Sequence, residues 1–325
     1  MNTSELLRQF QRLSALVIGD ICLDRWCTYE PGTAEPSRET GMPRVGVVRS
    51  EVTPGGGGTV ANNLVALGAG RVAVVGTIGN DGFGQELTGA LASRGIDSEL
   101  LVKAPGSQTF TYTKLLNAET GVEDLPRVDF INSKPLSEET ERRLLNRLNA
   151  HVGAFDVIIV ADQAETEQGG VVTPAVREML AYLASRNPTK VFWADSRRRT
   201  EQFRGIVVKP NQEEAANACQ RLFGHIDYRA LRKLIGGKAL VVTHGLEGAL
   251  VVEDTGETWV RTRAVQRPVD ICGAGDSFSA GAAMALAVTG SPTEAARIGN
   301  MVASVTIMKK GTGTASPEEL LRADV

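Results

Sequence analysis

Short runs of valine, isoleucine and other apolar residues recur along the chain and alternate with stretches that have the apolar period of a helix. Because the runs are apolar on both faces, they indicate strands of a parallel sheet that helices cover on each side. We therefore predict an α/β fold with a largely parallel central sheet. The predicted strands are residues 15–19, 71–76, 155–161, 190–194, 206–209, 239–243 and 249–253. The clearest predicted helices are residues 84–94, 138–150, 175–185 and 227–235.

Two segments, residues 22–53 and 107–132, interrupt this alternation because they have no helical period. In the second segment, polar and apolar residues alternate over residues 109–115, as they do in a strand with one covered face. We predict that both segments contribute strands to a small second sheet, inserted twice into one domain that spans residues 1–325. If this sheet lies beyond the carboxyl ends of the main strands, it would act as a lid over a site, as a surface for homodimer formation, or as both.

Charge and cysteine content exclude several classes of protein. The formal net charge of −3 argues against a partner such as nucleic acid, and we expect the run of three arginines at residues 197–199 to be a solvated turn. The four cysteines are too scattered for a disulfide scaffold, and the three histidines show no zinc-ligand spacing. The N-terminus has no apolar signal-peptide core, and no uncharged stretch approaches the roughly 20 residues of a membrane helix. We therefore expect a cytoplasmic protein without a membrane partner.

The candidate chemistry concentrates in residues 269–278, where a glycine-rich turn precedes a helix of small residues. The amide groups of Gly273, Ala274 and Gly275 would lie at the positive end of that helix, where they form an anion site that a phosphate can approach closely. Asp276 follows directly, and its carboxylate would repel a phosphate. We therefore expect it to be ionised at neutral pH, to face the acceptor and to take a proton from an attacking alcohol. The alternative is that Asp276 only caps the helix.

The string DICGAGDSF at residues 270–278 is similar to the second signature of the ribokinase-like sugar kinases, the phosphofructokinase-B family, whose usual form is D-T-x-G-A-G-D-x-F. The resemblance extends over nearly the whole chain. It implies a ribokinase-like fold and an ATP-dependent carbohydrate kinase, with Gly273, Ala274 and Gly275 as the anion hole and Asp276 as the catalytic base. Ile271 replaces the common threonine, so a side-chain hydroxyl is missing at that point.

Two upstream segments resemble the substrate-binding elements of the family. Asp24 follows the first strand, where the family has an aspartate that binds sugar hydroxyls; taken alone, it would be a turn aspartate at a strand end. The string PGGGGTVANN at residues 54–63 resembles the first signature, in which a glycine pair brings backbone amides close to the sugar, and Thr59 stands where the family commonly has asparagine. The resemblance assigns substrate binding to Asp24, Gly55, Gly56, Gly57, Thr59, Asn63 and Arg127.

Three further segments resemble the nucleotide site of the family. Asn211 and Glu214 form an N-x-x-E pair that in the family organises Mg²⁺ beside ATP, largely through water, although the same spacing is also that of a helix capping box. A hairpin with the pattern T-x-G-x-x-G begins at residue 243, and the helix and loop at residues 300–314 resemble those that flank adenine. The resemblance assigns ATP to Asn211, Thr243, Gly245, Gly248 and Asn300. Some relatives also depend on a monovalent cation such as K⁺.

Residues 19–26, 127–130 and 311–320 look like segments of the heptose 7-phosphate kinases, which phosphorylate the anomeric hydroxyl of a sugar that already carries a phosphate. Such a substrate needs a cationic pocket, for which Arg38, Arg44 and Arg127 are the candidates in the lid. The stretch at residues 35–43 departs from that subfamily. The alternatives are a kinase of another sugar or nucleoside, of the fructose, ribose or adenosine type, and a non-catalytic sensor of sugar or nucleotide. A nicotinamide dehydrogenase is disfavoured because GDICLD at residues 19–24 replaces G-x-G-x-x-G.

Overall fold

A computed structural model describes residues 1–33, 35–164, 166, 168–263, 265 and 267–323. The central sheet has the strand order β14-β13-β12-β11-β10-β9-β1-β4, with parallel neighbours from β4 to β12 and antiparallel pairs at the β13–β14 edge. The predicted parallel α/β architecture is therefore confirmed. Its strands are β1 Ser14–Gly19, β4 Arg71–Val75, β9 Val157–Asp162, β10 Val191–Ser196, β11 Val207–Val208, β12 Leu240–Thr243, β13 Ala249–Glu253 and β14 Gly256–Val260.

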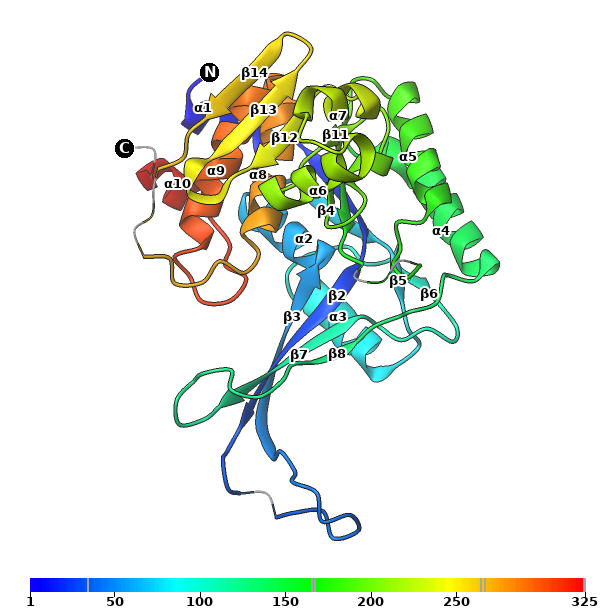
Figure 1. Ribbon diagram of the computed structural model, residues 1–325, viewed down its shortest axis with the longest axis vertical. Coiled ribbons are helices and arrows are strands. Elements are labelled where there is room, and N and C mark those ends of the chain that lie inside the picture. Colours follow the sequence, from blue (N-terminus) through cyan, green and yellow to red (C-terminus); the bar gives the residue numbers. More distant parts are fainter. Residues whose placement is uncertain (34, 165, 167, 264, 266, 324–325) are drawn as a thin grey trace.

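Helices cover both faces of this sheet, as Figure 1 shows. One apolar cluster joins the sheet to α1, α2, α3, α8, α9 and α10, and the second joins it to α4, α5, α6 and α7. Neighbouring strand residues such as Leu16 and Val17 belong to opposite clusters, which explains why the strands are apolar throughout. The helices are α1 Thr3–Phe10, α2 Gly57–Ala66, α3 Gly82–Ala92, α4 Glu138–His151, α5 Pro174–Arg186, α6 Gln212–Phe223, α7 Tyr228–Ile235, α8 Ala274–Thr289, α9 Pro292–Thr306 and α10 Pro317–Ala323, with short 3₁₀ turns at Val152–Ala154, Thr200–Gln202 and Gly245–Glu247.

The second, smaller sheet extends away from the main body (Figure 1). Its strand order is β3-β2-β7-β8, formed by β2 Ile21–Tyr29, β3 Val47–Gly56, β7 Thr111–Asn117 and β8 Val128–Phe130. We call it the lid sheet. Strands β2 and β7 are parallel, and the two outer pairs are antiparallel. The sheet predicted for residues 22–53 and 107–132 is therefore present, whereas the division of the chain into one domain with two insertions stays a prediction.

The sequence pattern missed two features of the sheets. Strand β14 escaped notice because it is a largely exposed edge strand and has no apolar run. The two-residue strands β5 Thr77–Ile78 and β6 Val102–Lys103, which pair in parallel, are too short to carry a period. Within the described residues, no helix is both long enough and apolar enough to cross a bilayer.

The parallel strands bring several polar side chains to one edge of the central sheet. Asp20 follows β1, Asp162 ends β9, Asp195 lies near the end of β10, and Lys209 follows β11. Because the carboxyl ends of parallel strands meet at the same edge, these residues lie beside the junction of body and lid sheet. That junction is the place to look for a functional site.

Candidate active site

A pocket of about 170 Å³ lies between the start of α8 and the inner face of the lid sheet. Six residues that the sequence marked as functional line it: Asp24, Gly56, Thr59, Arg127, Gly273 and Asp276. Eight others line it without having been assigned a role: Arg25, Trp26, Tyr112, Lys114, Gln163, Arg197, Cys272 and Thr312. The fold thus brings together the first and second glycine-rich signatures, which are far apart in the sequence.

The glycine-rich turn forms the body side of the pocket. Gly273 is the N-cap of α8 and has a φ of +77°, a left-handed conformation that favours glycine. Among the described residues no side chain caps this helix, so its first-turn amides remain available to an anion. The amide of Ala274 is partly occupied, because it donates a hydrogen bond of 3.2 Å to the carbonyl of Ile271.

Asp276 occupies the first turn of α8. Burial raises the pKa of its carboxyl to about 7, and the neighbouring Asp195 adds to the rise, while Lys209 and Arg197 oppose it. The sequence predicts an ionised carboxylate at neutral pH, whereas the buried carboxyl is only partly ionised there, because desolvation outweighs the attraction of the helix terminus. A carboxyl group that titrates near 7 is well matched to accepting a proton from an alcohol.

A buried ion pair lies beneath the turn. The ammonium group of Lys209 is 2.9 Å from Oδ2 of Asp195, and both side chains are less than 10% exposed. The same Oδ2 accepts a hydrogen bond of 3.0 Å from Ser279 of α8. Burial alone would lower the pKa of Lys209, but Asp195 and other nearby carboxylates raise it, so the side chain stays cationic. A Cβ built on Gly275 would lie 3.5 Å from Nζ of Lys209, which places this cation against the anion-binding turn.

The lid sheet supplies the opposite wall. Asp24 pairs in register with Tyr112, and Trp26 pairs with Lys114, so these four side chains share one face of the sheet. Burial raises the pKa of Asp24 to about 6, against the lowering effect of Lys114, Arg127 and Arg197. A Cβ on Gly55 would clash with the carboxylate of Asp24, which explains why glycine is needed at that position.

Cationic groups cluster at the lid side of the pocket. The Lys114 ammonium lies 4.7 Å from the ring centre of Trp26. Arg127 stacks on Tyr112 at 5.0 Å, and its guanidinium is 2.6 Å from Oδ2 of Asp129. These contacts, together with the carboxylate of Glu123 3.6 Å from the Lys114 ammonium, hold both cations near Asp24.

Two sequence-based expectations about arginines are wrong. Arg38 and Arg44 do not line the pocket, because the chain between β2 and β3 runs out to the far end of the lid sheet. Conversely, the run at residues 197–199 is not simply a solvated turn. Arg197 lines the pocket, and Arg199 is 9% exposed and lies 2.7 Å from the carboxylate of Asp162.

The N-x-x-E pair lies outside the pocket lining and forms a helix capping box. Oδ1 of Asn211 accepts from the amide of Glu214 at 2.8 Å, and Oε2 of Glu214 accepts from the amide of Asn211 at 2.7 Å. Burial raises the pKa of Glu214, and Asp195 raises it further, so the two carboxylates are close enough to repel. Asn211 also bridges to Thr243, which begins the hairpin of Gly245 and Gly248. The predicted nucleotide residues 211, 243, 245 and 248 therefore adjoin one another.

Three other predicted site residues serve the packing and do not line the pocket. The amide of Gly57 donates to the carbonyl of Asp20 at 2.9 Å. Asn63 is fully buried, and its Nδ2 donates to the carbonyl of Thr59 at 3.0 Å. Asn300 donates to the carbonyl of Val260 at 2.9 Å and so ties α9 to β14.

The carboxylates near the turn are oxygen ligands of the kind that Mg²⁺ takes in proteins. No group of three or more metal-binding side chains gathers within the described part of the chain, so a cage of direct protein ligands is not formed there. Besides burial, Asp195 raises the pKa of both Glu214 and Asp276, and Lys209 and Arg197 oppose the rise, so the three carboxylates lie close enough to interact. Mg²⁺ characteristically keeps several of its waters, as this arrangement requires.

Some of the unassigned pocket residues carried a signal in the sequence. Arg197 directly follows a buried strand, and the carboxyl ends of parallel strands are where ligands bind. Lys114 stands two residues after Tyr112 in an alternating strand, and hence on the same face. Trp26 likewise stands two residues after Asp24 on β2, and Thr312 lies in the segment 300–314 that resembles the loop beside adenine, so both also carried a signal.

The chain is similar to known proteins over nearly its whole length. The curated bifunctional protein HldE of Trichlorobacter lovleyi is 32% identical over 325 residues, and HldE of Geobacter sulfurreducens is 33% identical over 327; each alignment covers 98% of this chain and 64% of the relative. This chain thus spans slightly less than two thirds of the length of those proteins. Among solved structures, ribokinase of Thermotoga maritima has a TM-score of 0.70 at 20% identity, covering 96% of this chain and 99% of that one.

Phosphofructokinase-2 of Escherichia coli, solved with potassium, has a TM-score of 0.71 at 19% identity. The alignment covers 96% of this chain and 98% of that chain. These neighbours confirm that the fold is ribokinase-like. Residues 14–319 match the pfkB family of carbohydrate kinases, a span that contains the whole pocket. The chain therefore belongs to the pfkB carbohydrate kinase family.

Proposed function

We propose that this chain transfers the γ-phosphoryl group of ATP to a hydroxyl of a phosphorylated sugar, and that heptose 7-phosphate, with its anomeric hydroxyl as acceptor, is the first candidate. The observation that carries the proposal is the composition of the pocket. Asp276 at the anion-binding turn faces a lid wall on which Asp24 lies beside Lys114 and Arg127. A sugar hydroxyl suits the carboxylates, and a phosphate at the other end of the sugar suits the cations.

In the proposed reaction, Asp24 accepts hydrogen bonds from sugar hydroxyls and orients the acceptor. Asp276 takes the proton of the reacting hydroxyl as its oxygen attacks the γ-phosphorus and the bond to the β,γ-bridging oxygen breaks. The amides at the start of α8 and the ammonium of Lys209 stabilise charge on the moving phosphoryl group. Closure of the lid sheet excludes water, which would otherwise compete with the sugar.

The nucleotide would lie across the carboxyl ends of the strands, beside Asn211, Thr243 and Gly248. Bound Mg²⁺ would neutralise phosphate charge, and Asn211, Glu214 and Asp195 are the residues that would hold its waters. A K⁺ requirement is tested by replacing K⁺ with Na⁺ in the assay. Because the proposed donor is ATP, we also propose that the chain works in the cytoplasm.

We further propose a homodimer formed through the lid sheets. Val45, Val47 and Val48 near the start of β3 are each more than 40% exposed, as is Val122 in the loop between β7 and β8. Exposed apolar side chains on an open sheet favour pairing with a second copy. A light-scattering mass of one chain at micromolar concentration would exclude it.

The function is tested by measuring ADP release from the purified chain with MgATP and a panel of acceptors. The panel contains heptose 7-phosphate, fructose 6-phosphate, fructose, ribose and adenosine, and ³¹P NMR of each product identifies the phosphorylated position. We expect the highest kcat/KM with a sugar phosphate and a new anomeric phosphate on heptose 7-phosphate. A preference for an unphosphorylated sugar or a nucleoside would reassign the substrate. Nucleotide binding without sugar-dependent ADP release would indicate a sensor instead.

A further inference from the structure

The body side of the pocket contains a buried glutamine to which the proposed reaction gives no task. Gln163 directly follows β9, lines the pocket and is only 6% exposed. Among the residues that the structure describes, its side-chain amide has no hydrogen-bond partner, and the small exposed part of the side chain includes both amide atoms. An amide in such a place has lost most of its water without gaining a partner, which is unfavourable. We therefore expect a ligand in the pocket to supply the partner.

The backbone of Gln163 is fixed by the buried carboxylate of Asp20, which follows the neighbouring strand β1. Oδ2 of Asp20 accepts a hydrogen bond of 2.9 Å from the amide of Gln163, and Oδ1 accepts one of 2.8 Å from the amide of Val171. The carbonyl of Asp20 accepts from the amide of Gly57 at 2.9 Å. A single residue, only 1% exposed, thus holds both Gln163 and the glycine-rich segment. Support of this kind keeps a binding group in its direction.

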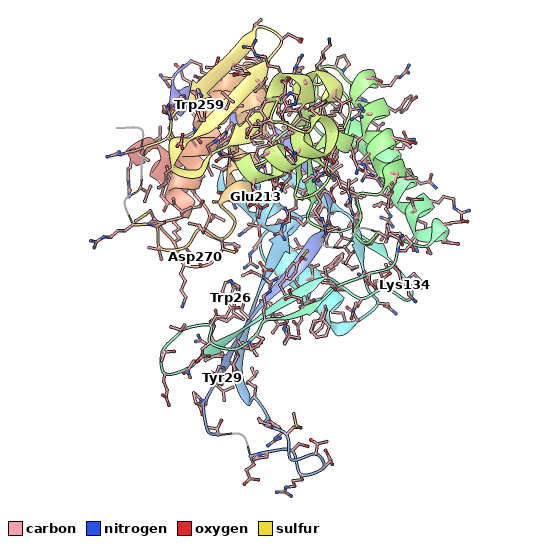
Figure 2. All side chains as sticks on the ribbon, in the orientation of Figure 1. Trp26, Tyr29, Lys134, Glu213, Trp259 and Asp270 are labelled. Carbon is pink, nitrogen blue, oxygen red and sulfur yellow. The ribbon has the colours of Figure 1, made fainter. Side chains whose placement is uncertain are left out.

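Gln163 and Asp24 stand on either side of the glycine pair. A Cβ built on Gly55 would clash with the carboxylate of Asp24, and one built on Gly56 would lie 3.6 Å from Cγ of Gln163. Asp24, Gly56 and Gln163 line the same pocket, and Figure 2 shows Trp26 on its lid wall, below the body. A ligand over the glycine pair would thus meet a carboxylate on the lid side and a neutral amide on the body side.

The two groups differ in the hydrogen bonds that they can form. An ionised carboxylate such as that of Asp24 only accepts, whereas the carboxamide of Gln163 offers one acceptor and two donors. A hydroxyl both donates and accepts, so of two adjacent hydroxyls one can donate to Asp24 while the other exchanges hydrogen bonds with Gln163. A sugar that lacks the second hydroxyl would leave the buried amide without a partner, and that penalty makes such a site selective.

We propose that Gln163 is a substrate-binding residue that selects the acceptor: its carboxamide binds a hydroxyl adjacent to the one that Asp24 holds, so the chain prefers sugars with two neighbouring free hydroxyls over their deoxy analogues. The inference rests on the proposed function in one respect, because it takes the occupant of the pocket to be the acceptor sugar. It adds a determinant of acceptor choice on the body to those proposed on the lid sheet.

The test compares kcat/KM for the preferred sugar of the panel with that for its single-deoxy analogues. We expect the wild type to lose roughly 5- to 30-fold with the analogue that lacks the contacted hydroxyl. Gln163→Met keeps the length of the side chain without its amide. It should lose a similar factor with the full sugar and should no longer distinguish that sugar from the analogue. Gln202→Met makes the same change at an exposed position outside the pocket, so it should behave as wild type.

A stability measurement separates recognition from packing. Because Gln163→Met removes a buried amide that has no partner, the thermal midpoint of the free protein should stay the same or rise. The increase in midpoint that saturating sugar produces should become smaller, because the variant binds the sugar less tightly. A lower midpoint of the free variant together with unchanged discrimination of the deoxy analogues would overturn the inference and make Gln163 a packing residue. Wild-type kcat/KM in Gln163→Met would overturn it as well.

Failure of the proposed function has a different signature. A wild-type chain that phosphorylates no sugar of the panel would refute the proposed function. Calorimetric titration of the same sugars into the wild type and into Gln163→Met then decides the inference. Tighter binding to the wild type would support the assignment of Gln163, whereas equal affinity, or no binding to either, would overturn it.

Discussion

The start of α8 and the lid sheet face each other across one pocket, but they are built in opposite ways. The turn at Gly273 offers backbone amides, is followed by a helix whose residues are mostly buried, and rests on the ion pair of Lys209 and Asp195. The lid sheet offers long side chains on one face of a thin layer, with exposed valines at its outer end. In the proposed function, the amides that stabilise the phosphoryl transfer are thus fixed in the core, whereas the side chains that recognise the acceptor stand on the lid sheet, outside that core.

This difference suggests a division of labour that substitution can test. Changes at the turn should remove turnover and leave acceptor recognition nearly intact. Changes on the inner face of the lid sheet should do the reverse. The buried ion pair of Arg199 and Asp162 should affect stability more than either.

The largest effect is expected for Asp276→Asn. Without the carboxylate that accepts the hydroxyl proton, kcat should fall by roughly 10²–10⁴-fold, while the KM for the acceptor should change little. Steady-state rates of ADP release measure both constants. Near-wild-type turnover in this variant would refute the assignment of Asp276 as the base and leave it only a helix-terminal residue.

The second effect concerns stability. Arg199→Met leaves the buried carboxylate of Asp162 without its ion-pair partner, and we expect the free energy of unfolding to fall by about 3–5 kcal/mol. Urea denaturation followed by circular dichroism measures it. The double variant with Asp162→Leu should recover part of the loss, because the uncompensated charge is removed. A decrease below about 1 kcal/mol for the single variant would show that Asp162 is stabilised by its other contacts.

The third effect belongs to the lid sheet. Lys114→Met removes one of the cations near Asp24, so kcat/KM for a phosphorylated sugar should fall by roughly 10- to 100-fold, as loss of a charge-assisted hydrogen bond implies. The value for the matching unphosphorylated sugar should change much less. Arg38→Met removes the same charge from the far end of the lid sheet and serves as the control. Equal losses for both sugars would place the acceptor phosphate elsewhere.

The smallest effect is a pH dependence of kcat/KM that distinguishes the titration of Asp276, on the body side of the pocket, from that of Asp24, on the lid sheet. Because the pKa of Asp276 is raised to about 7 and only its ionised form accepts a proton, kcat/KM should fall about tenfold per pH unit below 7. Below about 6, protonation of Asp24 should steepen the fall, since its pKa is raised to about 6. Asp24→Asn should remove the second, steeper part of the profile and keep the first. A profile that is flat between pH 5 and 8 would contradict both titrations.

The sequence by itself determined the parallel sheet and the glycine-rich turn at the start of α8. Both features are encoded by short stretches of sequence. A strand that is buried on two faces is apolar throughout, and the glycines and the aspartate at the start of α8 fall within ten residues. The resemblance of DICGAGDSF to a family signature pointed to a kinase, and the family match over residues 14–319 confirmed it.

Only the tertiary structure decided which side chains form the walls of the pocket and how they ionise. The side chains of the pocket walls come from segments that are far apart in the chain, among them Lys114, Arg197 and Trp26. Arg38 and Arg44 do not line the pocket, because they lie in the segment between β2 and β3 at the far end of the lid sheet. The ionisation of Asp276 likewise depends on burial and on Asp195, which the local pattern does not reveal. Periodicity and turn chemistry act over a few residues, but proximity, desolvation and charge coupling depend on how distant segments pack together.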